Sequence, residues 1–331
     1  MKKILVLGGT GAMGVYLVPE LASMGYKVDV VSLDNVVSRN PQITYIQANA
    51  KNDDFLRDLL KNRYDAIVDF LIYFPKEFEA RYEMLLKNTE HYIFLSSYRV
   101  YADSKVITEK SPRLLDVSTD SEYLSYAETE YSLYKALEEN ILRESGFHNW
   151  TIVRPAITYS KFRYQLVTLE ANVVVYRALN NLPVILPKEA LDIKGTMSWA
   201  GDVAKMLSRL VLNPSAQKEA YTVATSENHP WREIAQYYKE IIGLEYVEVD
   251  TETYLSIFGG DIHAAYQLKY DRCFNRVIDN SKILKATGMK QSDLMPLRQG
   301  LEKELMSLPE NVVWKETPIN ERIDEILDRM K

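Results

Sequence analysis

Tyr131 and Lys135 are the residues of this 331-residue chain whose types and spacing most directly suggest chemistry. Residues 128–145 are rich in Glu, Leu, Ala and Lys and precede Gly146, which predicts a helix ending at that glycine. Side chains four positions apart lie on the same face of a helix. A neighbouring ammonium lowers the pKa of a tyrosine hydroxyl because it favours the phenolate. The pair therefore predicts a general acid–base group, with Tyr131 transferring the proton.

Ser97 is the third candidate, because it ends the segment 91–97, which reads as a strand. Ser97 could orient a substrate hydroxyl by hydrogen bonding, and the adjacent Tyr98 could contact the same substrate. Tyr134 is a rival to Tyr131, but successive helical residues point about 100° apart, so Tyr134 should face away. We therefore predict that Ser97, Tyr131 and Lys135 are catalytic, and that Ser97, Tyr98 and Tyr131 contact the substrate.

A glycine-rich turn near the N-terminus predicts where a cofactor binds. Four apolar residues, 4–7, read as a buried strand, and residues 15–24 carry a helical apolar pattern. Glycines between a strand and a helix let backbone N–H groups approach a ligand, and the helix start attracts a pyrophosphate. The predicted dinucleotide contacts are Gly8, Gly9, Thr10, Gly11, Ala12, Met13 and Gly14.

The end of the second predicted strand, residues 27–33, bears on the choice of cofactor. An acidic residue there binds the adenosine ribose 2′-hydroxyl and repels a 2′-phosphate. Ser32 and Asp34 both lie near the usual spacing of about 20 residues from the glycines, so spacing does not choose between them. Asp34 favours NAD, whereas Ser32 together with Arg39 would suit NADP.

Strands and helices alternate through the first half of the chain. Further strands are predicted at residues 43–47, 64–71 and 150–153, and helices at 53–61 and 78–86. This alternation predicts an α/β fold with a Rossmann-type, doubly wound parallel sheet. Ligands bind beyond the carboxyl ends of such strands, so Asn49 (beside the adenine), Ala50 and Phe70 are further expected cofactor contacts.

The second half of the chain has a looser pattern. Helices are predicted at residues 166–179, 202–212 and 231–242, an extended segment at 183–187 and a strand at 221–224. No low-complexity linker separates the two halves, so we expect a small C-terminal substrate domain interleaved with the first. The expected division is a dinucleotide-binding domain at residues 1–160, to which 195–225 return, and a substrate-binding domain at 161–194 and 226–331.

Composition narrows the function classes. The net charge of −6 and the lack of long basic runs argue against nucleic-acid or anionic-membrane partners. The single cysteine, Cys273, fits a reducing compartment, and no apolar stretch is long enough to span a membrane, so we expect a cytoplasmic protein. The four histidines are scattered, and their spacing matches no metal site. The absence of Gly-x-Ser-x-Gly disfavours a serine hydrolase.

Four motifs in order resemble a known family. These are the turn at 8–14, Ser-Ser-Tyr-Arg-Val-Tyr at 96–101, Tyr-Ser-Leu-Tyr-Lys at 131–135 and Arg-Pro-Ala at 154–156. The chain resembles extended short-chain dehydrogenases/reductases of the NAD-dependent epimerase/dehydratase family, which act largely on nucleotide sugars. The resemblance implies that Ser97, Tyr131 and Lys135 form a catalytic triad. It also implies that the chain at Pro155 and Ala156 runs alongside the nicotinamide carboxamide.

The chain also departs from this family. Family dehydratases carry an acidic pair after the catalytic Ser/Thr, but Tyr98 and Arg99 stand there, which disfavours dehydration. The segment from Phe70 to Ser97 is shorter than in sugar epimerases, so a helix of the usual dimer interface could be trimmed, and both monomer and homodimer remain open. The favoured function is an NAD-dependent epimerase of a sugar or nucleotide sugar. The alternatives are an NADP-dependent reductase of a small carbonyl compound and a non-enzymatic dinucleotide sensor or RNA-associated relative.

Overall fold

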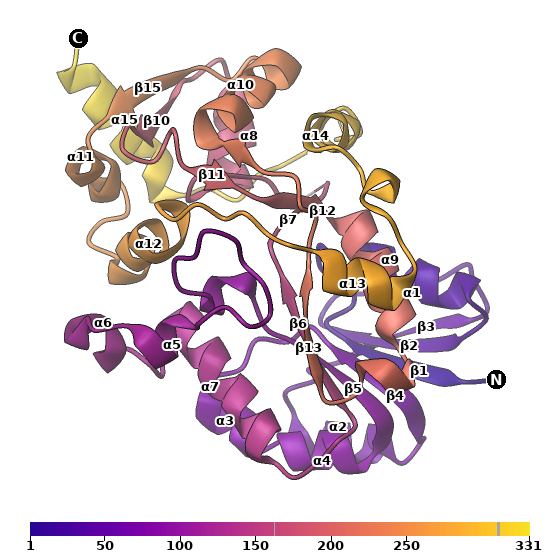
Figure 1. Ribbon diagram of the computed structural model, residues 1–331. Helices are drawn as coiled ribbons and strands as arrows, with labels where there is room; N and C mark the ends of the chain where they lie inside the picture. The colour runs from indigo at the N-terminus through magenta and orange to yellow at the C-terminus, as the bar shows by residue number, and fades with distance from the viewer. Residues whose placement is uncertain (162, 310–311) are drawn as a thin grey trace.

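A seven-stranded parallel sheet forms the centre of the molecule (Figure 1). The computed structural model describes residues 1–161, 163–309 and 312–331. The strand order is β13–β6–β5–β4–β1–β2–β3, and every neighbouring pair is parallel. The strands are β1 (Lys3–Leu7), β2 (Lys27–Ser32), β3 (Ile43–Gln47), β4 (Tyr64–Asp69), β5 (Thr89–Leu95), β6 (Trp150–Pro155) and β13 (Glu219–Val223). The predicted Rossmann-type α/β fold is confirmed.

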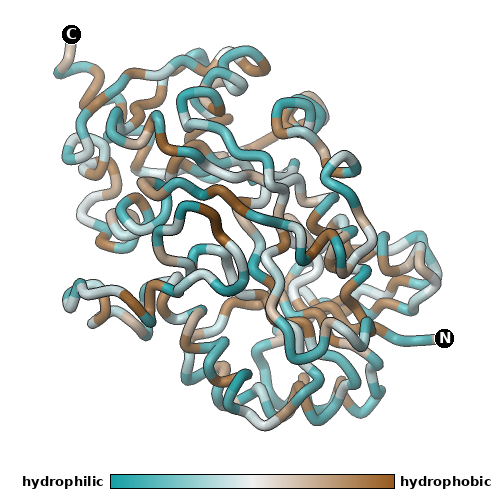
Figure 2. Tube along the Cα trace, viewed as in Figure 1, coloured by the Kyte–Doolittle hydropathy of each residue, from teal (hydrophilic) through white to brown (hydrophobic). Residues whose placement is uncertain are grey.

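The apolar run of β1 is buried from both sides because helices cover both faces of the sheet. Alternate side chains of a strand point to opposite faces. Ile4 and Val6 pack in one apolar cluster with α1 (Gly14–Ser23), α9 (Ala200–Leu210) and α13 (Ser281–Thr287). Leu5 and Leu7 pack in another with α2 (Asp53–Leu60), α3 (Pro75–Glu79), α4 (Tyr82–Lys87) and α7 (Tyr131–Glu144). Figure 2 shows the apolar strand segments enclosed by helices of mixed hydropathy.

Three predicted helices differ from those observed. The helix predicted at 78–86 is two short helices, α3 and α4, separated by Ala80 and Arg81, and the Arg81 guanidinium reaches Asp53 at 2.7 Å. The helix predicted from 128 begins at Tyr131, with Glu130 as its N-cap residue. The first part of the helix predicted at 166–179 is a hairpin of β8 (Gln165–Leu166) and β9 (Leu169–Glu170), followed by α8 (Ala171–Leu179).

A smaller C-terminal region lies over the carboxyl ends of the strands (Figure 1). In it, β10 (Val184–Pro187) pairs in parallel with β15 (Tyr246–Val249). Its helices are α8, α10 (Trp231–Ile242), α11 (Thr251–Ser256), α12 (Ile262–Gln267), α14 (Leu297–Leu305) and α15 (Pro318–Arg329). Because α9 and β13 return to the central sheet between β10 and α10, the two regions are interleaved.

Short elements complete the chain. The remaining strands are β7 (Ile157–Tyr159), β11 (Lys194–Gly195), β12 (Met197–Trp199) and β14 (His229–Pro230). The remaining helices are α5 (Leu114–Val117) and α6 (Ser121–Ser125), the 3-10 turns Tyr98–Val100, Pro214–Ala216 and Gln291–Asp293, and a π-helix at Leu268–Arg272. Among the helices of the described ranges, none is long and apolar enough to cross a membrane.

Candidate active site

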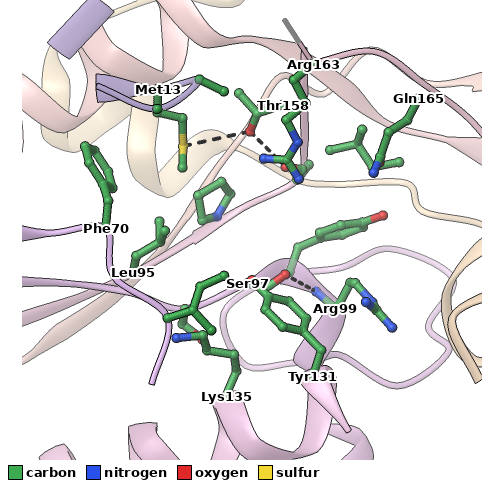
Figure 3. A pocket seen from close by; sticks show the side chains of 18 of the residues that line it. Met13, Phe70, Leu95, Ser97, Arg99, Tyr131, Lys135, Thr158, Arg163 and Gln165 are labelled. Carbon is green, nitrogen blue, oxygen red and sulfur yellow. Dashed lines mark hydrogen bonds between the residues drawn. The ribbon is translucent and has the colours of Figure 1, made fainter. Parts of the chain in front are cut away.

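A cavity of about 410 Å³ opens where the carboxyl ends of the central strands face the C-terminal region (Figure 3). The glycine turn, the ends of β4, β5 and β6, the start of α7, the β8–β9 hairpin and the π-helix all contribute to its lining. Of the predicted site residues, the cavity is lined by Gly8, Gly11, Ala12, Met13, Gly14, Phe70, Ser97, Tyr98, Tyr131, Lys135, Pro155 and Ala156.

The glycines of the turn serve different purposes. Gly8 has φ +75°, a conformation that glycine adopts without strain. A Cβ on Gly9 would lie 2.6 Å from Val30 Cγ1, and one on Gly14 would lie 2.3 Å from the Gly9 carbonyl oxygen, so both permit close packing within the protein. A Cβ on Gly11 would meet only the Gly8 carbonyl oxygen, at 3.7 Å. Among the glycines of the turn, Gly11 is therefore the one whose Cβ position faces open space.

The start of α1 fits the diphosphate of a dinucleotide. No side chain caps this ten-residue helix, and its first turn contains no acidic residue. The partial positive charge and free N–H groups of a helix N-terminus stabilise an anion. Because the same turn lines the cavity, the chain's own backbone could hold such a group there without competition from a capping carboxylate.

The residues predicted to meet the ribose form a small cluster beside the turn. The Thr10 hydroxyl donates a hydrogen bond to the Asp34 carboxylate at 2.6 Å and lies 2.6 Å from the Ser32 hydroxyl. Asp34 is exposed, but these contacts hold its carboxylate next to the glycine turn. Asn49 is exposed and accepts a hydrogen bond from the backbone two residues later, while Ala50 is buried in the core. None of these five residues lines the cavity, and neither does Gly9.

Ser97, Tyr131 and Lys135 come together on one side of the cavity (Figure 3). Ser97 lies two residues beyond β5, where its hydroxyl accepts a hydrogen bond from the Arg99 amide at 3.2 Å. Tyr131 is half-buried at the first position of α7. Tyr134 is buried against Phe74, with ring centroids 5.5 Å apart, and is absent from the cavity lining.

Lys135 is paired with an acid that the sequence analysis did not consider. Its ammonium donates a 2.8 Å hydrogen bond to Glu138, and both side chains are buried. Burial raises the pKa of Glu138 to about 7, and the negative charges of Asp69 and Glu139 act in the same direction, against the attraction of Lys135. The i, i+3 spacing of Lys135 and Glu138 was visible in the sequence, but their shared burial was not.

A second cation lies against Tyr131. The Arg99 guanidinium lies 5.2 Å from the centre of the Tyr131 ring and donates to Glu130 at 3.1 Å. Tyr98 lines the cavity, but its hydroxyl donates to Asp271 at 3.1 Å and accepts from Arg272 at 3.0 Å. Both hydrogen-bond partners of the Tyr98 hydroxyl belong to the C-terminal region. The hydroxyl is therefore already bonded within the protein and does not face a substrate.

No pattern in the sequence predicted the cavity wall that lies opposite Ser97 and Tyr131, here called the far wall. It includes Thr158, Arg163, Gln165, Gln267 and Arg272. These residues lie beyond β6, in β7, the loop after it, the β8–β9 hairpin, the end of α12 and the π-helix, where the sequence contains no readable motif. Their proximity to Tyr131 depends on how the C-terminal region packs onto the sheet.

The chain was compared with a family model and with solved structures. A model of the NAD dependent epimerase/dehydratase family matches residues 4–224. Among solved structures, MoeE5 in complex with UDP-glucuronic acid and NAD is 16% identical, with a TM-score of 0.69 over 92% of this chain and 98% of that one. The UDP-glucose 4-epimerase of Thermus thermophilus, in complex with NAD, is 17% identical, with a TM-score of 0.63 over 94% of this chain and 100% of that one.

One relative in sequence is named for what it binds and not for a reaction. The chloroplast stem-loop binding protein of 41 kDa b from Arabidopsis thaliana is 24% identical over 238 residues, which are 67% of this chain and 58% of that protein. The structural likenesses show the shared fold, and the family model spans most of the chain. On that match, and in agreement with the motifs of the turn, strand β5 and helix α7, the chain belongs to the NAD dependent epimerase/dehydratase family.

Proposed function

We propose that this protein is an NAD-dependent epimerase that acts on a hydroxyl carbon of a sugar or nucleotide sugar. The observation that carries the proposal is the shared cavity, which Ser97, Tyr131 and Lys135 line together with the glycine turn. NAD, when bound, supplies a hydride acceptor that can return the hydride to the opposite face of the substrate. The other steps belong to side chains of this chain.

Tyr131 accepts the proton of the substrate hydroxyl and later returns it, acting as general base and then general acid. Ser97 donates a hydrogen bond to the same substrate oxygen, and its buried position at the end of β5 limits its movement. Lys135 supplies positive charge from the adjacent helical turn and contacts the cofactor ribose. The backbone of Gly8–Gly14 holds the diphosphate, while Phe70, Pro155 and Ala156 border the nicotinamide side.

The cofactor choice rests on Asp34. Its carboxylate lies beside the turn and would repel a 2′-phosphate, so NAD should bind more tightly than NADP. An Asp34→Ala variant should narrow this difference, measured by titrating both nucleotides against protein fluorescence. An unchanged ratio of the two affinities would assign the ribose to other residues and reopen the alternative of Ser32 with Arg39.

The test of the reaction type begins with the nucleotide that the purified protein retains. Denaturation of the purified protein should release NAD, identified by mass spectrometry, because an epimerase regenerates its cofactor in each cycle and can retain it. The holoenzyme should then convert UDP-glucose or UDP-glucuronic acid to its epimer without added cofactor, followed by NMR. Loosely bound NADPH, oxidised to NADP in a one-to-one ratio with the carbonyl compound that is reduced, would contradict the epimerase and support the reductase.

RNA binding is a second candidate, favoured by the curated stem-loop binding relative. The net charge of −6 opposes it, because phosphate contacts by Lys and Arg supply most non-specific RNA affinity. A filter-binding titration with a stem-loop RNA should therefore show little retention at physiological salt. Tight, salt-dependent retention that survives Tyr131→Phe would support this role independently of catalysis.

A further inference from the structure

We propose that Glu138 is a positioning residue that acts through Lys135 and makes the cavity prefer the oxidised cofactor, NAD, over the reduced one, NADH. The inference rests on the proposed function in one respect, the contact of Lys135 with the cofactor ribose. It is carried by the burial, the hydrogen-bond partners and the charge balance of three side chains, those of Asp69, Glu138 and Lys135.

Glu138 holds the ammonium of Lys135 in place. Both side chains are buried, and the ammonium donates a hydrogen bond to the Glu138 carboxylate at 2.8 Å. The ammonium also lies 4.9 Å from the centre of the Phe94 ring. A lysine ammonium has three donors, and within the described part of the chain no second acceptor takes a hydrogen bond from it. Donors are therefore left for a ligand in the cavity that Lys135 lines (Figure 3).

The buried charges around Lys135 do not balance. Asp69, at the end of β4, is 1% exposed, and its negative charge acts on both Lys135 and Glu138. The neighbouring Glu139 is paired with Arg154, so two carboxyl groups share the one ammonium of Lys135. Because like charges that share a buried site are costly to ionise together, we expect one of the two acids to hold a proton up to neutral pH.

Hydrogen bonds indicate that Glu138 is the acid that holds this proton. The Asp69 carboxylate accepts from the Leu71 amide at 2.9 Å. It also accepts from the hydroxyls of Tyr73 at 3.0 Å and Tyr92 at 2.8 Å, and these three donors favour its charged form. Glu138 Oε1 is buried, and no described residue forms a hydrogen bond with it. Burial raises the pKa of both acids, and that of Glu138 reaches about 7.

The other titratable groups around Glu138 keep one charge at neutral pH. Burial raises the pKa of the hydroxyls of Tyr73, Tyr92 and Tyr134, so these stay neutral. Glu79 of α3 is exposed. The remaining charged residues near α7 form ion pairs: Lys76 with Glu128, Glu77 with Lys51, Arg81 with Asp53, Arg99 with Glu130, Arg113 with Asp116 and Glu139, and Arg154 with Glu139.

The charge of Glu138 distinguishes the two forms of the cofactor. NAD and NADH share the diphosphate and both riboses, but only the oxidised nicotinamide ring is positively charged. Glu138 lies one hydrogen bond behind Lys135, so its charge lies close to a ring whose ribose contacts Lys135. Charges in the interior are weakly screened by solvent. Ionised Glu138 should therefore favour NAD, and protonated Glu138 should lose this preference.

The test measures the ratio of the dissociation constants of NADH and NAD. NADH displaces NAD from the holoenzyme at a series of pH values, followed by NADH fluorescence. The ratio cancels the effects of pH on the diphosphate and the adenosine, which the two forms share. In the wild type it should rise about ten-fold as pH increases through about 7, the change expected if bound NAD lowers the pKa of Glu138 by about one unit.

Three variants separate the charge of Glu138 from its shape. Glu138→Gln imitates the protonated acid, so its ratio should stay at the low-pH value of the wild type throughout. Glu138→Asp keeps a carboxyl group that reaches Lys135 less well, so it should show a smaller rise. The matched control is Glu83→Gln, which breaks an exposed pair with Lys87 on α4 and should follow the wild type.

Each other outcome rejects the proposal. A ratio that does not change with pH in the wild type overturns it, and so does an equal rise in Glu138→Gln, because another group would then titrate. If Glu138→Gln does not fold, a rise of wild-type size in Glu138→Asp overturns it. Failure to bind NAD at all would reject the proposed function as well. The ratio needs no substrate, so the preference can be measured even if the epimerase reaction is absent.

Discussion

The positive charge around Tyr131 comes from two cations, each of which is paired with a buried carboxylate. Lys135 donates to Glu138 and Arg99 donates to Glu130. A paired cation presents less net positive charge to a neighbouring group than a free one does, because its carboxylate partner acts in the opposite direction. The protonation of Glu138 therefore affects how strongly Lys135 can activate Tyr131.

Tyr131→Phe tests the assignment of the acid–base residue. The substitution keeps the ring that packs against Arg99 and removes only the hydroxyl oxygen, so NAD should bind as in the wild type. Turnover should fall by roughly 10²–10⁴-fold, the usual contribution of such a group. The matched control is Tyr134→Phe, at a buried tyrosine outside the cavity lining, which should keep most of the activity. The opposite pattern would move the proton transfer to Tyr134.

Glu138→Gln tests the buried pair through stability. Folding raises the pKa of Glu138 from 4.5 to about 7, so the folded state holds its proton more tightly than the unfolded state. The stabilisation that this proton provides is fully present below pH 4.5 and is lost as the pH rises through about 7. Glutamine imitates the protonated acid at every pH. The wild type should therefore lose unfolding free energy relative to Glu138→Gln as pH rises across this window, measured by urea denaturation. Parallel profiles of the two proteins would show that Glu138 stays ionised.

At the scale of elements, the strand–turn–helix unit β1–α1 divides its glycines between folding and binding. Gly9 and Gly14 permit strand, turn and helix to pack closely, whereas Gly11 faces open space. The uncapped start of α1 lies in the same unit. Substitutions at different glycines of one motif should therefore have different consequences.

Gly11→Val and Gly14→Ala separate the two roles. A Cβ at Gly11 would lie no closer than 3.7 Å to a protein atom, so Gly11→Val should unfold near the wild-type temperature but lose NAD binding, measured by calorimetry. A methyl group at Gly14 would overlap the Gly9 carbonyl, and overpacking of this kind costs roughly 1–3 kcal/mol or more. Gly14→Ala should therefore lower the thermal midpoint. Retained NAD affinity in a folded Gly11→Val protein would remove the cofactor from this turn.

At the scale of the whole molecule, a buried ionic cluster joins the C-terminal region to the loop that carries Ser97. Asp271, 1% exposed, pairs with Arg272 and accepts from Arg276 at 2.8 Å. The same carboxylate accepts from Tyr98, the residue directly after Ser97. These contacts connect the far wall of the cavity with the residues around Tyr131, so the cluster helps to position both.

Asp271→Asn should destabilise the protein by roughly 3–5 kcal/mol, because it leaves two buried arginines without their carboxylate. Both arginines lower the pKa of Asp271, so its stabilising charge is present at neutral pH and is lost as pH falls through that lowered value. Urea denaturation at neutral pH measures the effect. Asp58→Asn breaks an exposed pair with Lys61 and should change stability little. Equal small losses in both variants would show that the cluster does not support the fold.

Local patterns in the sequence determined the central sheet and the motifs it carries. An apolar run at Ile4–Leu7 followed by Gly8 predicts a buried strand and a turn without knowledge of any distant residue, because strand burial and glycine conformation are short-range properties. The tyrosine and lysine of α7 share a face because helix geometry is periodic. The family followed from the order of such motifs.

Only the tertiary structure decided the environment of those motifs. Arg81, which lies between two helices where one was predicted, pairs with Asp53, and Tyr98 donates to a carboxylate 173 residues later in the chain. Arg163 and Tyr131, from segments about 30 residues apart, line the same cavity from different walls. Burial and ion pairing depend on contacts between segments far apart in sequence, and no local pattern encodes which segments meet. Sequence therefore located the proposed chemistry, while packing set its charges and the wall against which a substrate would lie.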